Sequence, residues 1–109
     1  MNNLINDLKN NEIPFVDIIK SIEKDYQHTP TAFKNGDVFN EADQNQGSAK
    51  VFAFAKINHL SKEDTLLLFA EHYKAVLADP EGSNHQNIRQ FMVHGWDGIT
   101  FEGEALTAK

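Results

Sequence analysis

Apolar residues recur at the spacing of a helical face in two stretches near the start of the chain. The first is short and is followed by Lys9-Asn10-Asn11, so it predicts a helix that stops early. The second begins after Pro14, whose missing N–H is not needed in the first turn of a helix. It ends at Thr29-Pro30, because the residue before a proline is disfavoured in the α region. The apolar positions are Leu4, Ile5 and Leu8 in the first stretch and Phe15, Ile18, Ile19, Ile22 and Tyr26 in the second.

The next segment, residues 31–40, has the pattern of a short β-hairpin. It places Asn35-Gly36 between apolar residues, and this pair readily takes the two positive φ angles of a type I′ turn. Residues 40–47 are mostly polar and rich in Asn and Gln. We expect an ordered loop there, in which side chains bond to the nearby backbone.

The run Val-Phe-Ala-Phe-Ala at 51–55 fits two structures. It could form a strand with both phenylalanines on one face, or a largely buried helix. Two alanines and a continuation to Leu60 favour the helix. Ser48 lies where it could cap the N-terminus of that helix.

Two later serines introduce helices by a common pattern. Ser61 is followed three residues later by Asp64, and Ser83 three residues later by a glutamine. Both pairs resemble a capping box. The apolar face after Ser61 runs through Leu77 and is broken at 79–82. The helix after Ser83 has its apolar face at Ile88, Phe91 and Met92 and ends at Gly95.

The C-terminal segment alternates apolar and polar residues. Ile99 and Phe101 therefore predict a short strand, which we expect to pair with the hairpin near Phe33. Together these elements predict one domain over residues 1–109 with an α+β fold that is mainly α. It would hold about four helices and a short antiparallel β element. The length of 109 residues and the hydrophobic content of 40% fit one compact domain.

Composition excludes several classes of protein. The chain carries 10 Lys and Arg against 16 Asp and Glu, a net charge of −6, whereas a nucleic-acid clamp needs a basic surface. Cysteine is absent, which excludes disulfides, thiolate catalysis and Cys-bound clusters or zinc. No apolar run is long enough for a signal peptide or a membrane span. We therefore expect an acidic cytoplasmic protein that binds neither nucleic acid nor membrane.

Several longer segments, spread from the first long helix to the C-terminus, belong to one family pattern. They are Pro30-Thr31-Ala32-Phe33-Lys34-Asn35-Gly36, Asn40-Glu41-Ala42, Asn45-Gln46-Gly47-Ser48, Phe52-Ala53-Phe54-Ala55, His85-Gln86-Asn87-Ile88-Arg89-Gln90-Phe91 and Gly95-Trp96-Asp97-Gly98-Ile99. In this order they resemble the HopJ family. The resemblance covers nearly the whole chain and is more specific than any single short motif.

The resemblance implies a small bacterial protein of unestablished biochemistry. The family takes its name from a type III secreted effector of plant-pathogenic bacteria, so secretion through a type III system would follow if that label applies here. It supplies no catalytic residues to carry over. The sequence departs from the family pattern at Asp43, where Gly is usual, and at Ala49, where Cys is common. A thiol-dependent activity at that position is therefore excluded for this chain.

The five histidines do not form a recognisable metal motif. No His-x-x-x-His pair places two ligands on one helical face. His85 and His94 lie about 13 Å apart along a helix axis, which is too far to share a metal. Nucleophile-elbow and phosphate-loop motifs are also absent. We expect no metal and no cofactor.

Two groups of polar residues are candidates for a ligand site. One is the polar loop after the hairpin, where side-chain oxygens and amides could line a small pocket. The other surrounds the single arginine, whose guanidinium could bind a carboxylate or phosphate, or could make a structural salt bridge to Asp97 or Glu41. We expect the tryptophan in this group to pack against a helix with its N–H bonded. The candidate ligand-binding residues are Asn40, Glu41, Asn45, Arg89, Trp96 and Asp97.

Two functions remain open at this point. The missing catalytic motifs, acidic composition and small size favour a non-catalytic binding or interaction protein, with a protein partner or a small anionic ligand. The alternative is a small enzyme or small-molecule binder with a polar pocket. That pocket would be formed by Glu41, Asn45, Arg89 and Trp96.

Overall fold

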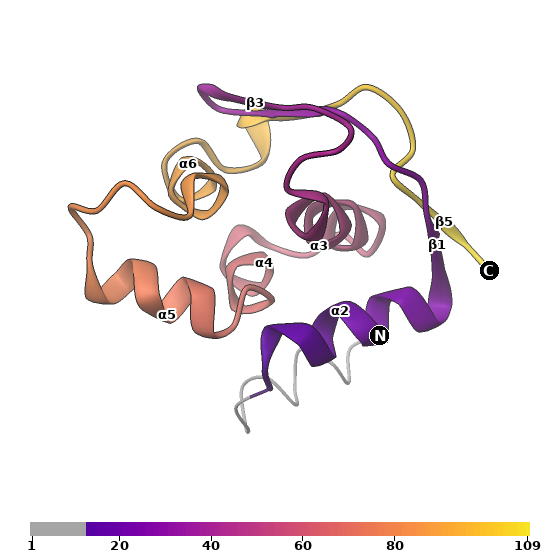
Figure 1. Cartoon of the computed structure of the whole chain (residues 1–109), viewed down its shortest axis with the longest axis horizontal. Helices are drawn as coiled ribbons and strands as arrows, with labels where there is room; N and C mark the ends of the chain where they lie inside the picture. The colour runs from indigo at the N-terminus through magenta and orange to yellow at the C-terminus, as the bar shows by residue number, and fades with distance from the viewer. Residues whose placement is uncertain (1–12) are drawn as a thin grey trace.

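The computed structural model describes residues 13–109, so the helix expected on Leu4, Ile5 and Leu8 lies outside the described residues. Helices surround a central helix, with a three-stranded sheet at one end and a two-stranded sheet along one side (Figure 1). The α-helices are α2 (Phe15–Asp25), α3 (Gln46–Ile57), α4 (Lys62–Leu67), α5 (Glu71–Ala78) and α6 (Gln86–His94). The other elements are the 3-10 helix η1 (Gly95–Gly98) and the strands β1 (Tyr26–His28), β2 (Phe33–Asn35), β3 (Val38–Asn40), β4 (Ile99–Phe101) and β5 (Leu106–Ala108).

Helix α3 is the centre of the core, and the preference for a helix over a strand in this segment is confirmed. All five residues from Val51 to Ala55 are buried. The ring of Phe52 lies 4.9 Å from that of Phe91 and 5.3 Å from that of Phe69, measured between centroids. Because α3 is apolar on nearly all sides, neighbouring elements must cover it, which fixes the layout of the rest of the domain.

Helix α2 begins after Pro14 as predicted, and its buried face holds Ile18 and Ile22. It ends at Asp25, four residues before the expected stop at Thr29-Pro30. The reason is tertiary: residues 26–28 become strand β1 and pair antiparallel with β5. Strand β5 carries no signal that the sequence analysis recognised.

The predicted hairpin is confirmed, and so is its pairing with the C-terminal strand. In the sheet β3-β2-β4, Phe33 lies opposite Phe101. The turn itself differs from the prediction. Its central residues are Gly36 and Asp37, and only Gly36 has a positive φ, of 59°. A type I′ turn on Asn35-Gly36 is therefore wrong, because Asn35 stays in the strand with its side chain buried.

Two glycines let the hairpin turn approach η1 closely. The Gly36 N–H donates to the Gly98 carbonyl at 2.9 Å. A Cβ atom at Gly98 would lie 2.7 Å from Cβ of His94 and 3.1 Å from the Gly36 nitrogen. A side chain at position 98 would therefore push the turn away from α6 and η1.

The single apolar face expected from Leu66 to Leu77 is divided between two helices. Ser61 caps α4 as predicted, since its Oγ accepts the backbone N–H of Asp64 at 3.1 Å. Helix α4 then ends at Leu67, and α5 begins only after Ala70, whose φ is 52°. This left-handed residue redirects the chain, so that one continuous pattern in the sequence produces two helices.

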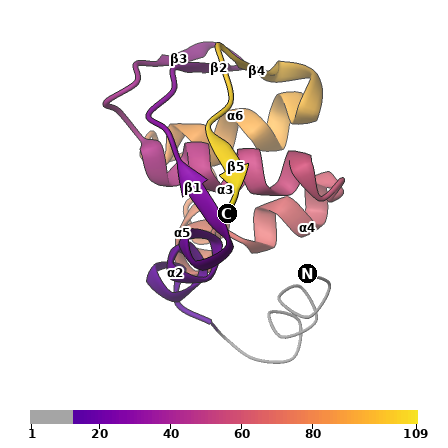
Figure 2. The ribbon, with the colours of Figure 1, turned by 90° about the vertical axis from the view of Figure 1, so that its right-hand side faces the viewer.

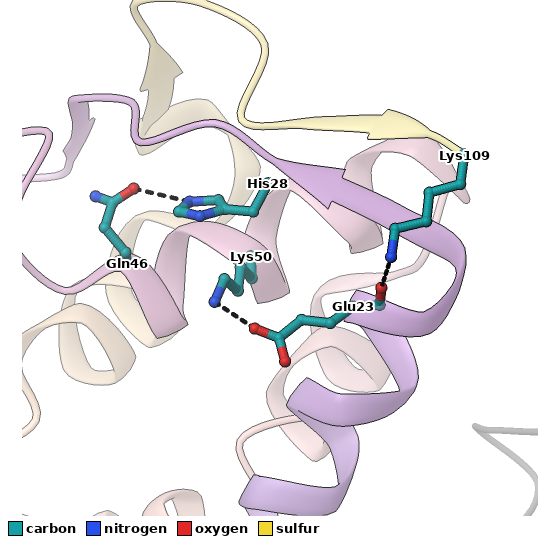
Figure 3. A network of polar contacts seen from close by, with 5 residues as sticks. All are labelled: Glu23, His28, Gln46, Lys50 and Lys109. Carbon is teal, nitrogen blue, oxygen red and sulfur yellow. Dashed lines mark hydrogen bonds and ion pairs between the residues drawn. The ribbon is translucent and has the colours of Figure 1, made fainter.

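Polar contacts join α2 to α3 and to the C-terminal residue (Figure 3), and Figure 2 shows β5 beside β1, the strand that follows α2. Lys50 on α3 forms an ion pair with Glu23 on α2 at 2.7 Å, and Lys109 donates to the Glu23 carbonyl at 2.7 Å. The hydrogen bond from Lys50 lowers the pKa of the Glu23 carboxyl below its usual value. Within residues 13–109, no helix is long and apolar enough to cross a bilayer.

Candidate functional site

The Arg89 side chain hydrogen-bonds to the loop between α5 and α6. Its Nη1 donates to the carbonyls of Asp79 at 2.9 Å and Pro80 at 3.3 Å, while Nη2 donates to Asn84 Oδ1 at 2.7 Å and Nε to the Asn84 carbonyl. Neither acidic partner considered from the sequence is among these contacts. The guanidinium therefore holds this loop in shape, and few of its donors are left for a ligand.

Trp96 is packed as the sequence predicted. Its Nε1 donates to the carbonyl of Leu60 at 3.1 Å, and its ring meets that of Phe91 edge-on, with centroids 5.1 Å apart. Asp97 follows it in η1 and is exposed. Trp96 thereby joins α6 to the segment that precedes α4.

The loop 40–47 satisfies much of its own backbone, as expected. The N–H of Glu41 donates to Gln44 Oε1 at 3.2 Å, and Gln46 Nε2 donates to the carbonyls of Gln44 at 2.8 Å and Thr31 at 3.2 Å. Gln46 Oε1 also accepts the Thr31 N–H at 3.1 Å, and it lies 3.0 Å from His28 Nε2 (Figure 3). The Glu41 side chain is exposed.

Asn40 belongs to a cluster of four asparagines that joins the hairpin to α3 and α6. We call Asn35, Asn40, Asn45 and Asn87 the asparagine cluster. Asn40 Oδ1 accepts from Asn45 at 2.7 Å and from Asn87 at 3.0 Å. Asn87 Oδ1 accepts in turn from Asn35 at 3.0 Å and from Asn40 at 3.1 Å. Because three of the four are buried, this cluster sets where the N-termini of α3 and α6 lie.

A cavity of about 360 Å³ opens beside this cluster, between the first turns of α3 and α6, and we call it the α3–α6 cavity. Of the candidate residues, it contains Asn45. Glu41, Arg89 and Trp96 are not among its lining residues, so the four residues expected to form one pocket do not meet in this cavity. The cavity is lined by Phe15, Val38, Asn45, Gly47, Ser48, Phe69, His72, His85, Gln86, Asn87 and Ile88.

The two helices whose first turns line the cavity each follow a residue with a left-handed backbone conformation. Asn45 precedes α3 and His85 precedes α6, each with φ of 51° and neither with a side-chain cap. The caps predicted at Ser48 and Ser83 are therefore wrong. Ser48 lies inside α3, and Ser83 lies outside α6, where its carbonyl accepts from the Gln86 side chain. Residues of the first turns of two helices, where backbone N–H groups carry a partial positive charge, thus line one cavity.

Two histidines face each other in the cavity. The ring centroids of His72 and His85 are 5.1 Å apart, with their planes at 40°. No hydrogen bond joins either imidazole to another of the described residues. The sequence analysis missed this pair because the residues are thirteen positions apart on different elements, and no spacing rule connects them.

Next to the first turn of α3 the cavity lining is aromatic, since a Cβ atom at Gly47 would lie 3.6 Å from the Phe15 ring, and one carboxylate lies nearby. Phe15 stacks on Phe69 at 6.0 Å and meets His72 edge-on at 4.9 Å. Glu71 Oε1 accepts the Phe15 N–H at 2.8 Å, and this bond lowers the pKa of the Glu71 carboxyl below its usual value. Within residues 13–109, no three metal-ligating side chains of the His, Cys, Asp or Glu type come together.

The sequence model of the HopJ type III effector protein family matches residues 1–106. The chain belongs to this family. A similar HopJ-like fold is found in the crystal structure of an unknown function protein, VPA0580, which is 46% identical in sequence and superposes with a TM-score of 0.93. That match covers 100% of this chain and 93% of the other. No curated protein matches the chain.

Two of the segments that carry the HopJ resemblance contribute to the cavity. Residues 45–48 supply its α3 side, and residues 85–88 supply its α6 side. The two departures from the family pattern lie away from this lining: Asp43 is exposed in the loop, and Ala49 is fully buried in α3. Parts of two family segments therefore lie at the cavity, together with lining residues outside those segments such as Phe15, Phe69 and His72.

Proposed function

We propose that this HopJ family member is a non-catalytic binding protein that takes a small anionic ligand in the α3–α6 cavity. The observation that carries the proposal is the pair of imidazoles, His72 and His85, 5.1 Å apart on one cavity. An imidazole N–H donates to an anion, and a protonated imidazole adds attraction. The first turns of α3 and α6 supply backbone N–H groups on the same side.

The size and chemistry of the cavity support binding without catalysis. A volume of about 360 Å³ is at the small end of ligand pockets. Ser48 lines the cavity, but within residues 13–109 no hydrogen bond connects it to either imidazole, as an activated serine nucleophile would require. Translocation by a type III system, to which the family name refers, is a separate property on which this proposal does not depend.

The proposal is tested by thermal unfolding with small anions, each compared with sodium chloride at equal ionic strength. A ligand at a hundredfold excess over its Kd adds about 2.7 kcal/mol to the free energy of unfolding, which raises Tm by several degrees in a domain of this size. In a parallel NMR titration, the imidazole signals of His72 and His85 should shift. Stabilisation that depends only on ionic strength would contradict the proposal and would direct the search to a protein partner.

His85→Asn and His59→Asn form a matched pair of variants. Both histidines have a left-handed backbone, with φ of 51° at His85 and 54° at His59, and asparagine tolerates that conformation. Only His85 lies on the cavity. We expect His85→Asn to weaken anion binding about tenfold, since the shorter, neutral amide replaces an imidazole that reaches further into the cavity and can carry a positive charge. His59→Asn should bind as the unmodified protein does, and equal weakening in both variants would contradict the site.

A further inference from the structure

The α3–α6 cavity is lined by both hydrogen-bonding and apolar groups. His72, His85 and the first turns of α3 and α6 provide the first kind, and Phe15 and Phe69 provide the second. The two kinds lie side by side, since the Phe15 ring meets that of His72 edge-on at 4.9 Å. A ligand that uses both must combine a hydrogen-bonding group with an apolar body, whereas a bare inorganic anion would make no apolar contact with the phenylalanine rings.

The charges around the cavity favour a ligand with a single negative charge. Sites for phosphate groups usually hold Lys or Arg, whose charge offsets two negative charges. None of the residues that line this cavity is a Lys or an Arg. Glu71 adds a carboxylate next to His72, bonded to the Phe15 N–H at 2.8 Å. A second negative charge on the ligand would therefore add to the repulsion from Glu71, and no Lys or Arg within residues 13–109 lines the cavity to offset it.

We infer that the ligand is a monocarboxylate with an apolar body, its carboxylate between His72, His85 and the helix N-termini and its body against Phe15 and Phe69. This inference rests on the proposed function and narrows it to one class of anion. A carboxylate accepts N–H donors with both oxygens, and the imidazoles and backbone amides provide such donors. The apolar wall then adds the free energy of burying the body of the ligand.

Four probes separate the contributions of charge and apolar body. Benzoate has both, benzamide has the same shape without charge, acetate has the charge without the body, and inorganic phosphate has a higher charge. Dissociation constants come from NMR titration of the full chain at constant ionic strength and neutral pH. We expect benzoate to bind at least about tenfold more tightly than each of the other three.

The outcomes distinguish this inference from the proposed function. Phosphate or acetate binding as tightly as benzoate would overturn the inference and leave the anion site standing. Benzamide binding as tightly as benzoate would overturn both, because the charge would then contribute nothing. Absence of binding by all four probes would overturn the proposed function itself.

Phe15→Leu and Phe39→Leu test the apolar wall with the same substitution. Phe15 lines the cavity, whereas Phe39 is 49% exposed and is not among the lining residues. Phe15→Leu should reduce benzoate affinity several-fold more than acetate affinity, and Phe39→Leu should change neither. Equal effects on both ligands would overturn the placement of the apolar body. If Phe15→Leu does not fold, the ligand series on the unmodified protein still decides the inference.

Discussion

Helix α4 begins at a serine that caps it, whereas α3 and α6 begin at left-handed residues without a side-chain cap. At α4 the first backbone N–H groups are partly satisfied within the chain, by Ser61 Oγ. At α3 and α6 they belong to first turns that line a cavity shared with two imidazoles. The first backbone N–H groups of a helix can therefore be capped by a side chain, which adds stability, or left open to a ligand.

The asparagine cluster holds the uncapped N-termini of α3 and α6 in place. Their positions depend on Asn40, which links Asn45 before α3 to Asn87 in α6. A single polar cluster therefore orients both ends toward one point. Substitutions at each kind of helix start test whether the capped start serves stability and the uncapped starts serve binding.

The largest effect is expected from Asn40→Ala. Asn40 is 1% exposed, and its loss removes the acceptor of the buried Asn87 Nδ2 group and one of the two donors to Asn87 Oδ1. We expect the free energy of unfolding to fall by about 3 kcal/mol, measured by denaturant titration. Asn40→Asp is a sharper control, because it keeps an acceptor for Asn45 but places a carboxylate oxygen opposite Asn87 Oδ1. It should destabilise comparably, and a neutral effect of either variant would show that the cluster does not hold the helix ends.

A smaller effect, on stability alone, is expected from Ser61→Ala. This change removes the hydrogen bond to the Asp64 N–H and should lower the free energy of unfolding by about 1 kcal/mol. Binding of benzoate should stay the same, because Ser61 is not among the residues of the cavity. Weaker binding in Ser61→Ala would mean that the capped and uncapped helix starts are not separate in function.

The sequence predicted the α4 start and failed at α3 and α6 for a physical reason. Ser61 caps through a local interaction between neighbours in the sequence, so its pattern is informative. Ser48 and Ser83 show similar patterns, but the chain enters both helices through a left-handed residue. The hairpin residue Asn40 bonds to Asn45 before α3 and to Asn87 in α6, contacts that no local pattern reveals. The helix over 15–25, the helical state of 51–57 and the hairpin were predictable because apolar spacing or a turn pair determined each one.

The candidate site was less predictable than the fold. Arg89 and Trp96 were chosen because their chemistry suits ligands, and in the structure that same chemistry binds backbone carbonyls. The cavity instead gathers side chains from α2, β3, α5 and the starts of α3 and α6. Among the candidate residues, only Asn45 lines the cavity. Residues that distant elements bring together in space leave no periodic pattern in the sequence, so the sequence could not point to the others.

His85→Gly should raise stability and lower binding at once. A left-handed backbone is unfavourable for histidine and favourable for glycine. After subtracting the greater entropy of glycine in the unfolded chain, we expect a gain of about 0.5 kcal/mol in the free energy of unfolding. Benzoate affinity should fall, as in His85→Asn. His59→Gly is the matched control and should gain stability without losing affinity; unchanged affinity in His85→Gly would remove His85 from the site.

The smallest effect is expected from Glu71→Gln, and only as a change with pH. Helix α5 also follows a left-handed residue, Ala70, but it carries Glu71 in its first turn, where the carboxylate accepts the Phe15 N–H. Because this bond lowers the pKa of Glu71 in the folded state, its contribution is present above the pKa of the unfolded chain. It is lost as pH falls through the lowered value.

The unmodified protein should therefore be slightly more stable than Glu71→Gln at neutral pH, and the difference should vanish in acid. Chemical denaturation at a series of pH values from neutral down to about 3, below the usual pKa of a glutamate, measures this convergence. If the stability difference is independent of pH, the carboxylate charge has no part in it. The contact between α5 and α2 would then act as a neutral hydrogen bond to the Phe15 N–H, which the glutamine of Glu71→Gln can also accept.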